Sequence, residues 1–158
     1  MKFRHRLKKM KKYSIVLSLI ILLTNGCEKD DLCIEEVTPN LILRFCDVTN
    51  PSNTLAADGL TIWPEGRDSI VVNQTLDSIA IPLDVNNEQT IYNFSSGAAI
   101  DQITIYYTVN EIFVSRSCGY KAGFSNLLAI PTNSWIEYIE QLTTTVEDES
   151  AAHIQIFH

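Results

Sequence analysis

The chain has 158 residues, of which 46% are hydrophobic and 20% are charged, and this composition is ordinary for one globular domain. Seven of its 12 basic residues lie within residues 1–12. Residues 27–158 therefore hold 5 basic and 19 acidic residues, a net charge of −14. Because so acidic a surface repels phosphate groups, the sequence excludes nucleic acid as a partner.

The first 26 residues have the organisation of a secretory signal. The basic segment 1–12 is followed by an apolar run of eleven residues, Tyr13–Leu23. A run of this length falls short of the about 20 residues that cross a bilayer as a helix. The pattern predicts a signal peptide over residues 1–26.

The residues that follow resemble the lipobox of bacterial lipoproteins, in which a small residue precedes a cysteine whose thiol is diacylated. Gly26 and Cys27 match that pattern, whereas Thr24 and Asn25 depart from the commonest form, which has leucine three residues before the cysteine. The resemblance implies that Cys27 carries lipid, with palmitate-type acyl chains. Each buried CH₂ group contributes about 0.8 kcal/mol, so two or three chains form an essentially permanent membrane anchor.

Residues 27–38 are predicted to form a lipidated tether, and residues 39–158 a single β-domain. Within that domain, short runs rich in β-branched and aromatic residues alternate with turn residues, which is typical of strands. The segment 111–118 is either a separate strand or the continuation of one long bent strand, and 147–150 reads as a hairpin loop. The expected strands cover residues 41–48, 59–63, 68–72, 77–83, 88–94, 101–109, 111–118, 135–146 and 151–157.

This strand spacing predicts an all-β fold, an antiparallel β-sandwich of the Ig-like kind, with a small β-barrel as the alternative. Pro82 places its strand at a sheet edge or at a bulge. A helix over 134–142, capped by Ser134, is the weaker reading of that segment.

Three cysteines remain if Cys27 carries lipid, and outside the cytoplasm two of them are expected to pair. Spacing alone does not decide which two. Cys33 and Cys118 lie at segment ends, where the backbone is adaptable, whereas Cys46 lies within a strand. We therefore expect a Cys33–Cys118 disulfide and a free Cys46, a bridge worth about 2–4 kcal/mol.

The sequence offers no catalytic motif, no metal-ligand spacing and no cofactor fingerprint. His153 is expected to be a sheet residue, and the terminal His158 to be loose. Glu137 and Glu140 read as surface carboxylates, and the loop 47–59 as a turn-rich loop rather than a calcium site.

Five segments together resemble a family of small lipoproteins of unknown function from Bacteroidetes, typical of flavobacteria. The resemblance implies an envelope location and no defined activity. In that family the position of Cys46 is usually aromatic, and Cys33 and Cys118 match a recurring pair, which supports the expected disulfide. The segments are CEKDDLC, LILRFCD, DSIAIPL, VSRSCGY and AAHIQIFH.

Two shorter patterns resemble modification or sorting signals of the same phylum. Lys29, Asp30 and Asp31 resemble a surface-export signal, although a charged tether would look the same. The triplet Asp-Ser-Ile occurs twice and resembles an O-glycosylation acceptor, which would place sugar on Ser69 and Ser78; turn chemistry at a strand start is the alternative.

These features predict a lipoprotein of the outer membrane, at the cell surface or on the periplasmic face. It is expected to be a non-enzymatic binding or accessory module for an envelope protein, such as an outer-membrane protein, or for a glycan. A hydrolase that processes envelope material or carbohydrate is the alternative, and it would need a cleft with convergent carboxylates.

Overall fold

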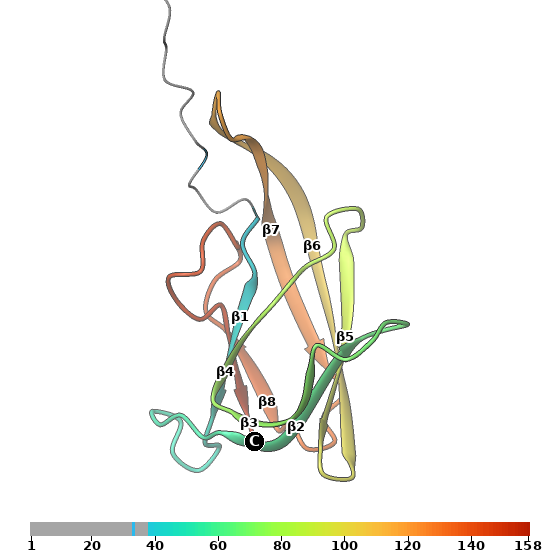
Figure 1. Cartoon of the computed structure of the whole chain (residues 1–158). Coiled ribbons are helices and arrows are strands. Elements are labelled where there is room, and N and C mark those ends of the chain that lie inside the picture. The colour runs from blue at the N-terminus through green and yellow to red at the C-terminus, as the bar shows by residue number, and fades with distance from the viewer. Residues whose placement is uncertain (1–32, 34–37) are drawn as a thin grey trace, which may run out of the picture. The chain divides into compact units, whose positions relative to one another are not determined.

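The computed structural model describes Cys33 and residues 38–158. The predicted signal peptide, the predicted lipid site Cys27 and the predicted export residues Lys29, Asp30 and Asp31 lie outside the described residues. The chain divides into two units, Met1–Cys33 and Ile34–His158, and the second holds every described strand. The strands are β1 (Leu41–Cys46), β2 (Ala57–Pro64), β3 (Val71–Leu76), β4 (Ser78–Ile81), β5 (Gln89–Ser96), β6 (Ala99–Ser115), β7 (Gly119–Pro131), β8 (Tyr138–Gln141) and β9 (Ile154–Phe157), as labelled in Figure 1.

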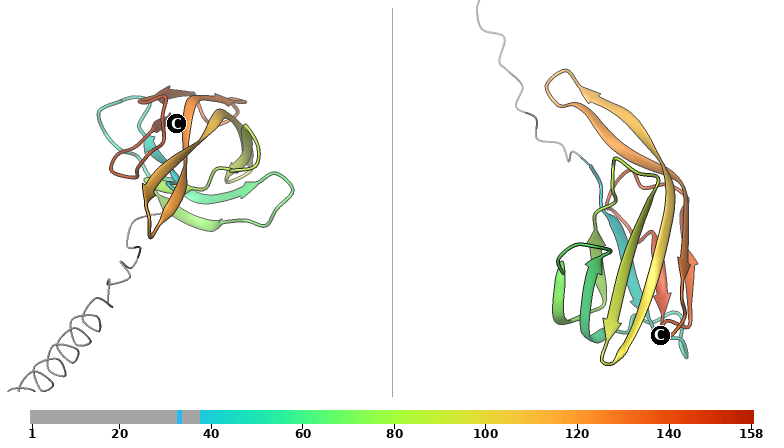
Figure 2. Two further views of the ribbon diagram at one scale, coloured as in Figure 1. Left: turned by 90° about the horizontal axis from the view of Figure 1, so that it is seen from above. Right: turned by 90° about the vertical axis from the view of Figure 1, so that its right-hand side faces the viewer.

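The strands form two sheets that pack face to face, which confirms the predicted β-sandwich (Figures 1 and 2). Sheet A has the order β4-β1-β9-β8, and sheet B has the order β3-β2-β5-β6-β7. Neither sheet closes into a barrel. The described strands pair antiparallel with one exception, because β1 and β9 run parallel, with Leu43 opposite Ile154.

Alternation along the strands builds the core between the sheets. In β1, Leu41, Leu43 and Phe45 are at most 1% exposed, whereas Arg44 points to solvent. In β6, Ile103 and Ile105 are buried in the same way. A period of two places every second side chain on the inner face, so the hydrophobic pattern of the sequence also fixes the register.

The observed strands differ from the expected ones in several places. No strand was expected over β7 (Gly119–Pro131), and the strand expected over 68–72 lies at Val71–Leu76 as β3. The expected strands 101–109 and 111–118 form one long strand, β6, which was the alternative reading, except that β6 ends at Ser115 and residues 116–118 form a turn. The segment 135–146 contributes only the short strand β8, and no helix forms over 134–142. β4 lies at the edge of sheet A and ends just before Pro82, as a residue without an N–H requires.

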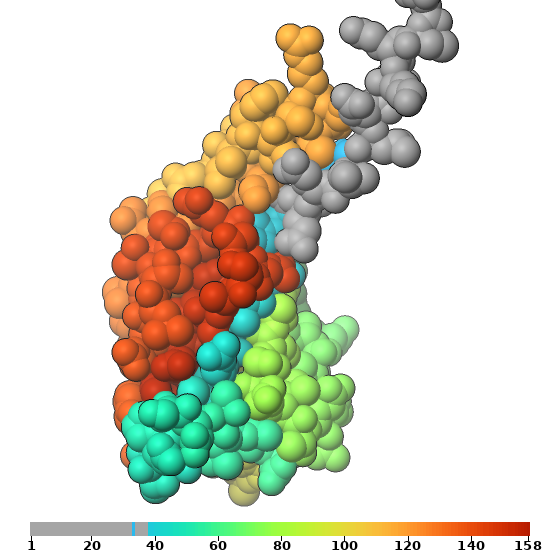
Figure 3. All heavy atoms as spheres, turned by 90° about the vertical axis from the view of Figure 1, so that its left-hand side faces the viewer, coloured from blue at the N-terminus to red at the C-terminus, as the bar shows by residue number. Residues whose placement is uncertain are grey.

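The connection between β8 and β9 is longer than the predicted loop 147–150. It spans residues 142–153 and crosses to sheet B, where the N–H groups and carbonyls of Val146 and Phe124 exchange two hydrogen bonds of 2.8 and 3.0 Å. Figure 3 shows this connection, in red, packed over the side of the domain. It shields the middle of β7, which is an edge strand of sheet B.

The C-terminal His158 is held in place, contrary to the expectation that it would be loose. Its carbonyl accepts a hydrogen bond from Val48 N at 3.3 Å, and its Nε2 lies 3.1 Å from the carbonyl oxygen of Leu55. Its ring also makes edge contacts with Phe45 and Trp135, at centroid distances of 6.1 and 5.5 Å. Because His158 directly follows β9, the parallel pairing of β9 with β1 positions this end of the chain.

Candidate functional site

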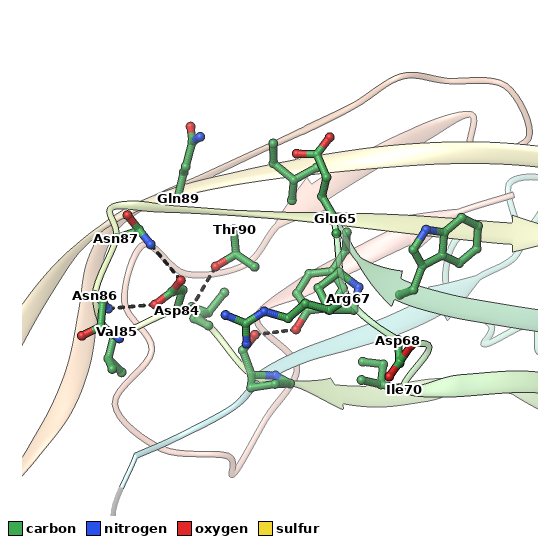
Figure 4. Close-up of a pocket in the computed structure, with 17 residues that line it drawn as sticks. Glu65, Arg67, Asp68, Ile70, Asp84, Val85, Asn86, Asn87, Gln89 and Thr90 are labelled. Carbon is green, nitrogen blue, oxygen red and sulfur yellow. Dashed lines mark hydrogen bonds between the residues drawn. The ribbon is translucent and has the colours of Figure 1, made fainter.

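An open groove of about 1410 Å³ lies between two loops of the described domain (Figure 4). One wall is the turn between β2 and β3, residues 64–70, and the other is the loop between β4 and β5, residues 82–90. The first residues of β5 line it as well. Gln89, the first residue of β5, pairs with Tyr106 far along β6, so the groove lies toward the end of the sandwich where β6 and β7 meet in their hairpin.

Two buried tyrosine hydroxyls hold the β4–β5 loop in place. Tyr92 Oη donates to the carbonyl of Pro82 at 2.7 Å, and Tyr107 Oη donates to the carbonyl of Asp84 at 2.9 Å. Tyr107 Oη also lies 2.5 Å from Thr90 Oγ1, which accepts from Asp84 N at 3.0 Å. Burial raises the pKa of Tyr92 to about 12 and also raises the pKa of Tyr107, so both remain neutral donors at physiological pH.

Asp84 organises the tip of the same loop. Its Oδ1 accepts from Asn86 N at 2.9 Å and its Oδ2 accepts from Asn87 Nδ2 at 2.8 Å, which makes an Asx-type turn (Figure 4). These hydrogen bonds lower the pKa of Asp84, and the nearby charge of Arg67 lowers it further. The Arg67 side chain extends from the opposite wall into the space between the two loops.

The lining of the groove suits binding. It combines the indole of Trp63, the guanidinium of Arg67 and the amide side chains of Asn86, Asn87 and Gln89. Aromatic faces, amides and a guanidinium are the groups that hold sugar rings, peptide carbonyls and carboxylates. Three carboxylates, Glu65, Asp68 and Asp84, also line the groove, and hydrogen bonds lower the pKa of Asp84.

The described residues contain no group of three or more histidine, cysteine, aspartate or glutamate side chains placed to hold a metal ion. In the loop 47–59, Asp47 Oδ1 accepts from Thr49 N and Thr49 Oγ1, both at 2.7 Å. Asp58 Oδ1 accepts from Thr75 Oγ1 at 2.9 Å. Both carboxylates thus close local turns or bridge neighbouring strands.

The cysteines divide as the sequence predicts. Cys33 and Cys118 form a disulfide, and Cys46 is a free thiol that is 1% exposed. Burial raises the pKa of Cys46. Gly119, next to Cys118, has φ +72°, a left-handed conformation that glycine adopts without steric cost and that closes the hairpin between β6 and β7.

The structure places the two glycosylation candidates, Ser69 and Ser78, at exposed positions on different elements. Ser69 lies in the turn between β2 and β3, whereas Ser78 opens β4 and donates to Asp77 Oδ1 at 3.1 Å. Glu137 and Glu140 are exposed on and beside β8, remote in sheet order from β4 and its loop. None of the four lines the groove.

His153 has a structural role. It is 6% exposed, and its Nδ1 accepts from Ile42 N at 2.9 Å, so the ring is neutral with the proton on Nε2. Burial lowers its pKa, against the opposing influence of Asp148 and Glu149. The side chain therefore joins β1 to the β8–β9 connection.

Sequence reasoning missed Asp101, the most heavily bonded side chain of the described domain. It is fully buried in β6, and its two carboxylate oxygens accept four hydrogen bonds. The available signal is its phase: Asp101 shares the inward positions of Ile103 and Ile105, and a carboxylate buried there needs hydrogen-bond donors. The donors are Thr132 Oγ1 (2.7 Å), Ser134 N (2.6 Å), Trp135 N (2.7 Å) and Ile136 N (2.8 Å).

Within the described residues, no helix is both long enough and apolar enough to cross a membrane. Searches of curated proteins and of solved structures each found no match. Residues 59–158 match a family described as a family of unknown function, DUF6452. That region contains three of the five segments that carried the family resemblance, DSIAIPL, VSRSCGY and AAHIQIFH. The chain, matched over most of its length and over all of the sandwich except β1 and the start of β2, belongs to the DUF6452 family.

Proposed function

We propose that this protein is a lipid-anchored lipoprotein of the bacterial outer membrane whose β-sandwich binds an envelope protein or a glycan in the groove between residues 64–70 and 82–90. The observation that carries the binding role is the fixed β4–β5 loop. Tyrosine hydroxyls pin its backbone, while polar side chains at its tip are left facing an open groove. A preformed wall of this kind lowers the entropy cost of binding.

The anchor rests on the sequence: a basic segment, a short apolar run and then Gly26-Cys27. Cells fed an azide-bearing fatty acid should label the wild-type protein and should not label the Cys27→Ala variant. Cys46→Ala is the matched control, because it removes a buried thiol and should leave labelling unchanged. Labelling that persists in Cys27→Ala would overturn the anchor.

Outward display rests on Lys29, Asp30 and Asp31, which follow the lipid site. Protease added to intact cells should degrade the wild-type protein. Replacing these three residues by alanine should leave the lipoprotein in the outer membrane but protected from protease. Protection of the wild type on intact cells would place it on the periplasmic face instead.

Binding in the groove is tested by photo-crosslinking in the native membrane. Val85 lies in the groove wall and is 45% exposed, so a photoreactive residue there should capture the ligand. Glu140, an exposed residue of β8 at the opposite edge of sheet A from β4, is the control position. We expect a product at Val85 that is absent at Glu140 and that is lost when Arg67→Ala is added. Identical products at both positions, or none at Val85, would contradict a ligand in the groove.

A further inference from the structure

The hairpin of β6 and β7 extends past the rest of the sandwich. The last residue of β6 that pairs with β5 is Tyr106, yet β6 continues to Ser115. Residues 110–122, here called the hairpin arm, thus form a two-stranded ribbon. Figures 1 and 2 show this arm projecting from one end of the domain, and the space-filling view shows its tip standing clear of the domain body (Figure 3).

The arm carries an aromatic pair that the domain does not bury. Phe113 and Tyr120 lie opposite each other in the register, with ring centroids 5.3 Å apart in an edge-to-face arrangement. They are 58% and 64% exposed. By alternation along β6, Phe113 continues the row of inward residues that includes Ile105 and Tyr107, but sheet A does not reach this far to cover it.

The charge of the arm differs from that of the rest of the domain. The arm holds Arg116, Lys121 and Glu111, a net charge of +1, whereas the remainder of residues 38–158 holds 2 basic and 13 acidic residues. Arg116 is exposed, and Lys121 donates to the carbonyl of Glu147 at 3.0 Å. An anionic surface therefore repels the body of the domain but not the arm.

The disulfide ties the arm tip to the segment that follows the predicted lipid site. Cys118, at the tip, is bonded to Cys33, and Cys33 follows the predicted lipid site Cys27 by six residues. Six fully extended residues span at most about 20 Å. A lipid on Cys27 would therefore hold the arm tip within about that distance of the membrane surface.

From these observations we propose that the hairpin arm contacts the lipid bilayer, with Phe113 and Tyr120 in the interfacial region and Arg116 and Lys121 among the phosphate groups. The inference rests on the lipid anchor of the proposed function. Aromatic rings with an apolar body settle at the membrane–water interface, and basic side chains reach headgroups from there. The arm would thus give the anchored domain a second membrane contact and a defined orientation.

Fluorescence quenching tests this contact. The wild-type lipoprotein and its variants are reconstituted into vesicles of phosphatidylethanolamine with a minority of phosphatidylglycerol, with or without lipids brominated near the headgroup end of the acyl chain. Tyr120→Trp, and independently Phe113→Trp, should add emission that the brominated lipid removes. Leu55→Trp is the control, because Leu55 is 41% exposed in the β1–β2 loop at the other end of the sandwich, and its added emission should not be quenched.

Flotation of the same samples separates the two hypotheses. If the wild-type protein fails to float with vesicles, or floats no better than Cys27→Ala, the anchor is wrong. If it floats but neither arm tryptophan is quenched, the anchor stands and the arm contact is wrong, with the aromatic pair covered by another part of the chain or a second copy. Equal quenching at Leu55→Trp would also overturn a contact specific to the arm.

Discussion

Asp101 shows how one residue can join the two sheets. Its carboxylate lies in β6 of sheet B and binds the backbone of residues 134–136, which lead into β8 of sheet A. Burial alone would raise its pKa, but the hydrogen bonds from Ile136, Thr132, Trp135 and Ser134 outweigh burial and lower it. The crossing between the sheets thus depends on a charged group that is fully enclosed.

Asp101→Ala should lower the free energy of unfolding by at least about 3 kcal/mol, because it leaves buried donors without an acceptor. Asp101→Asn should cost less. Since the folded-state pKa lies below the unfolded value, the stability that the carboxylate contributes is present above the unfolded pKa of about 3.9 and is lost as the pH falls toward the folded pKa. In urea denaturation at a series of pH values, the free energy of unfolding should therefore fall less steeply with decreasing pH for Asp101→Asn than for wild type. Equal slopes would contradict this role.

At the scale of elements, the sequence predicts strands where alternation is regular and fails where it is interrupted. β6 was expected from Ile103, Ile105 and Tyr107, but β7 was not expected at all. In β7 an extra residue shifts the register opposite Tyr107, with Asn126 at φ +55°. Phe124 and Leu127 therefore both point inward although they are three positions apart. A bulge of this kind destroys the period on which strand prediction rests.

The groove was not predictable for a related reason. The tyrosine that pins Asp84 lies 23 residues away along the chain, and its hydroxyl reaches the loop only after the sheets have formed. The sequence did predict Cys33, Cys118 and Cys46 in their observed roles, because segment ends and strand interiors are local properties.

Tyr107→Phe should release the β4–β5 loop. It removes the donor to the Asp84 carbonyl and a partner of Thr90 Oγ1, and we expect a loss of about 1–2 kcal/mol in unfolding free energy. Hydrogen exchange of residues 82–90 should also become faster. Tyr106→Phe is the control, because Tyr106 is 42% exposed on the outer face, and it should change stability by less than about 0.5 kcal/mol. Unchanged exchange in Tyr107→Phe would show that the hydroxyl does not fix the loop.

At the scale of the whole molecule, the disulfide and the free thiol lie in different parts of the structure. The disulfide joins Cys33, ahead of the first strand, to the hairpin tip, whereas the free thiol of Cys46 lies inside the sandwich. A reagent in solution should therefore meet Cys46 only after unfolding, because the side chain is 1% exposed and burial raises its pKa.

Mature protein purified without reductant should show one titratable thiol per chain in denaturant, and this thiol should react far more slowly in the native state. Cys46→Ala should abolish the signal. A second measurement after reduction should reveal the two disulfide cysteines. Three thiols before reduction would contradict the bridge, and two would contradict the acylation of Cys27.

The position of β9 bears on the order in which the domain can fold. β9 follows every other described strand along the chain, yet it lies inside sheet A between β1 and β8. Sheet A therefore cannot be completed until residues 154–157 are available, and until then β1 is paired with β4 alone. A chain truncated before residue 154 lacks β9, the strand through which β1 and β8 belong to one sheet.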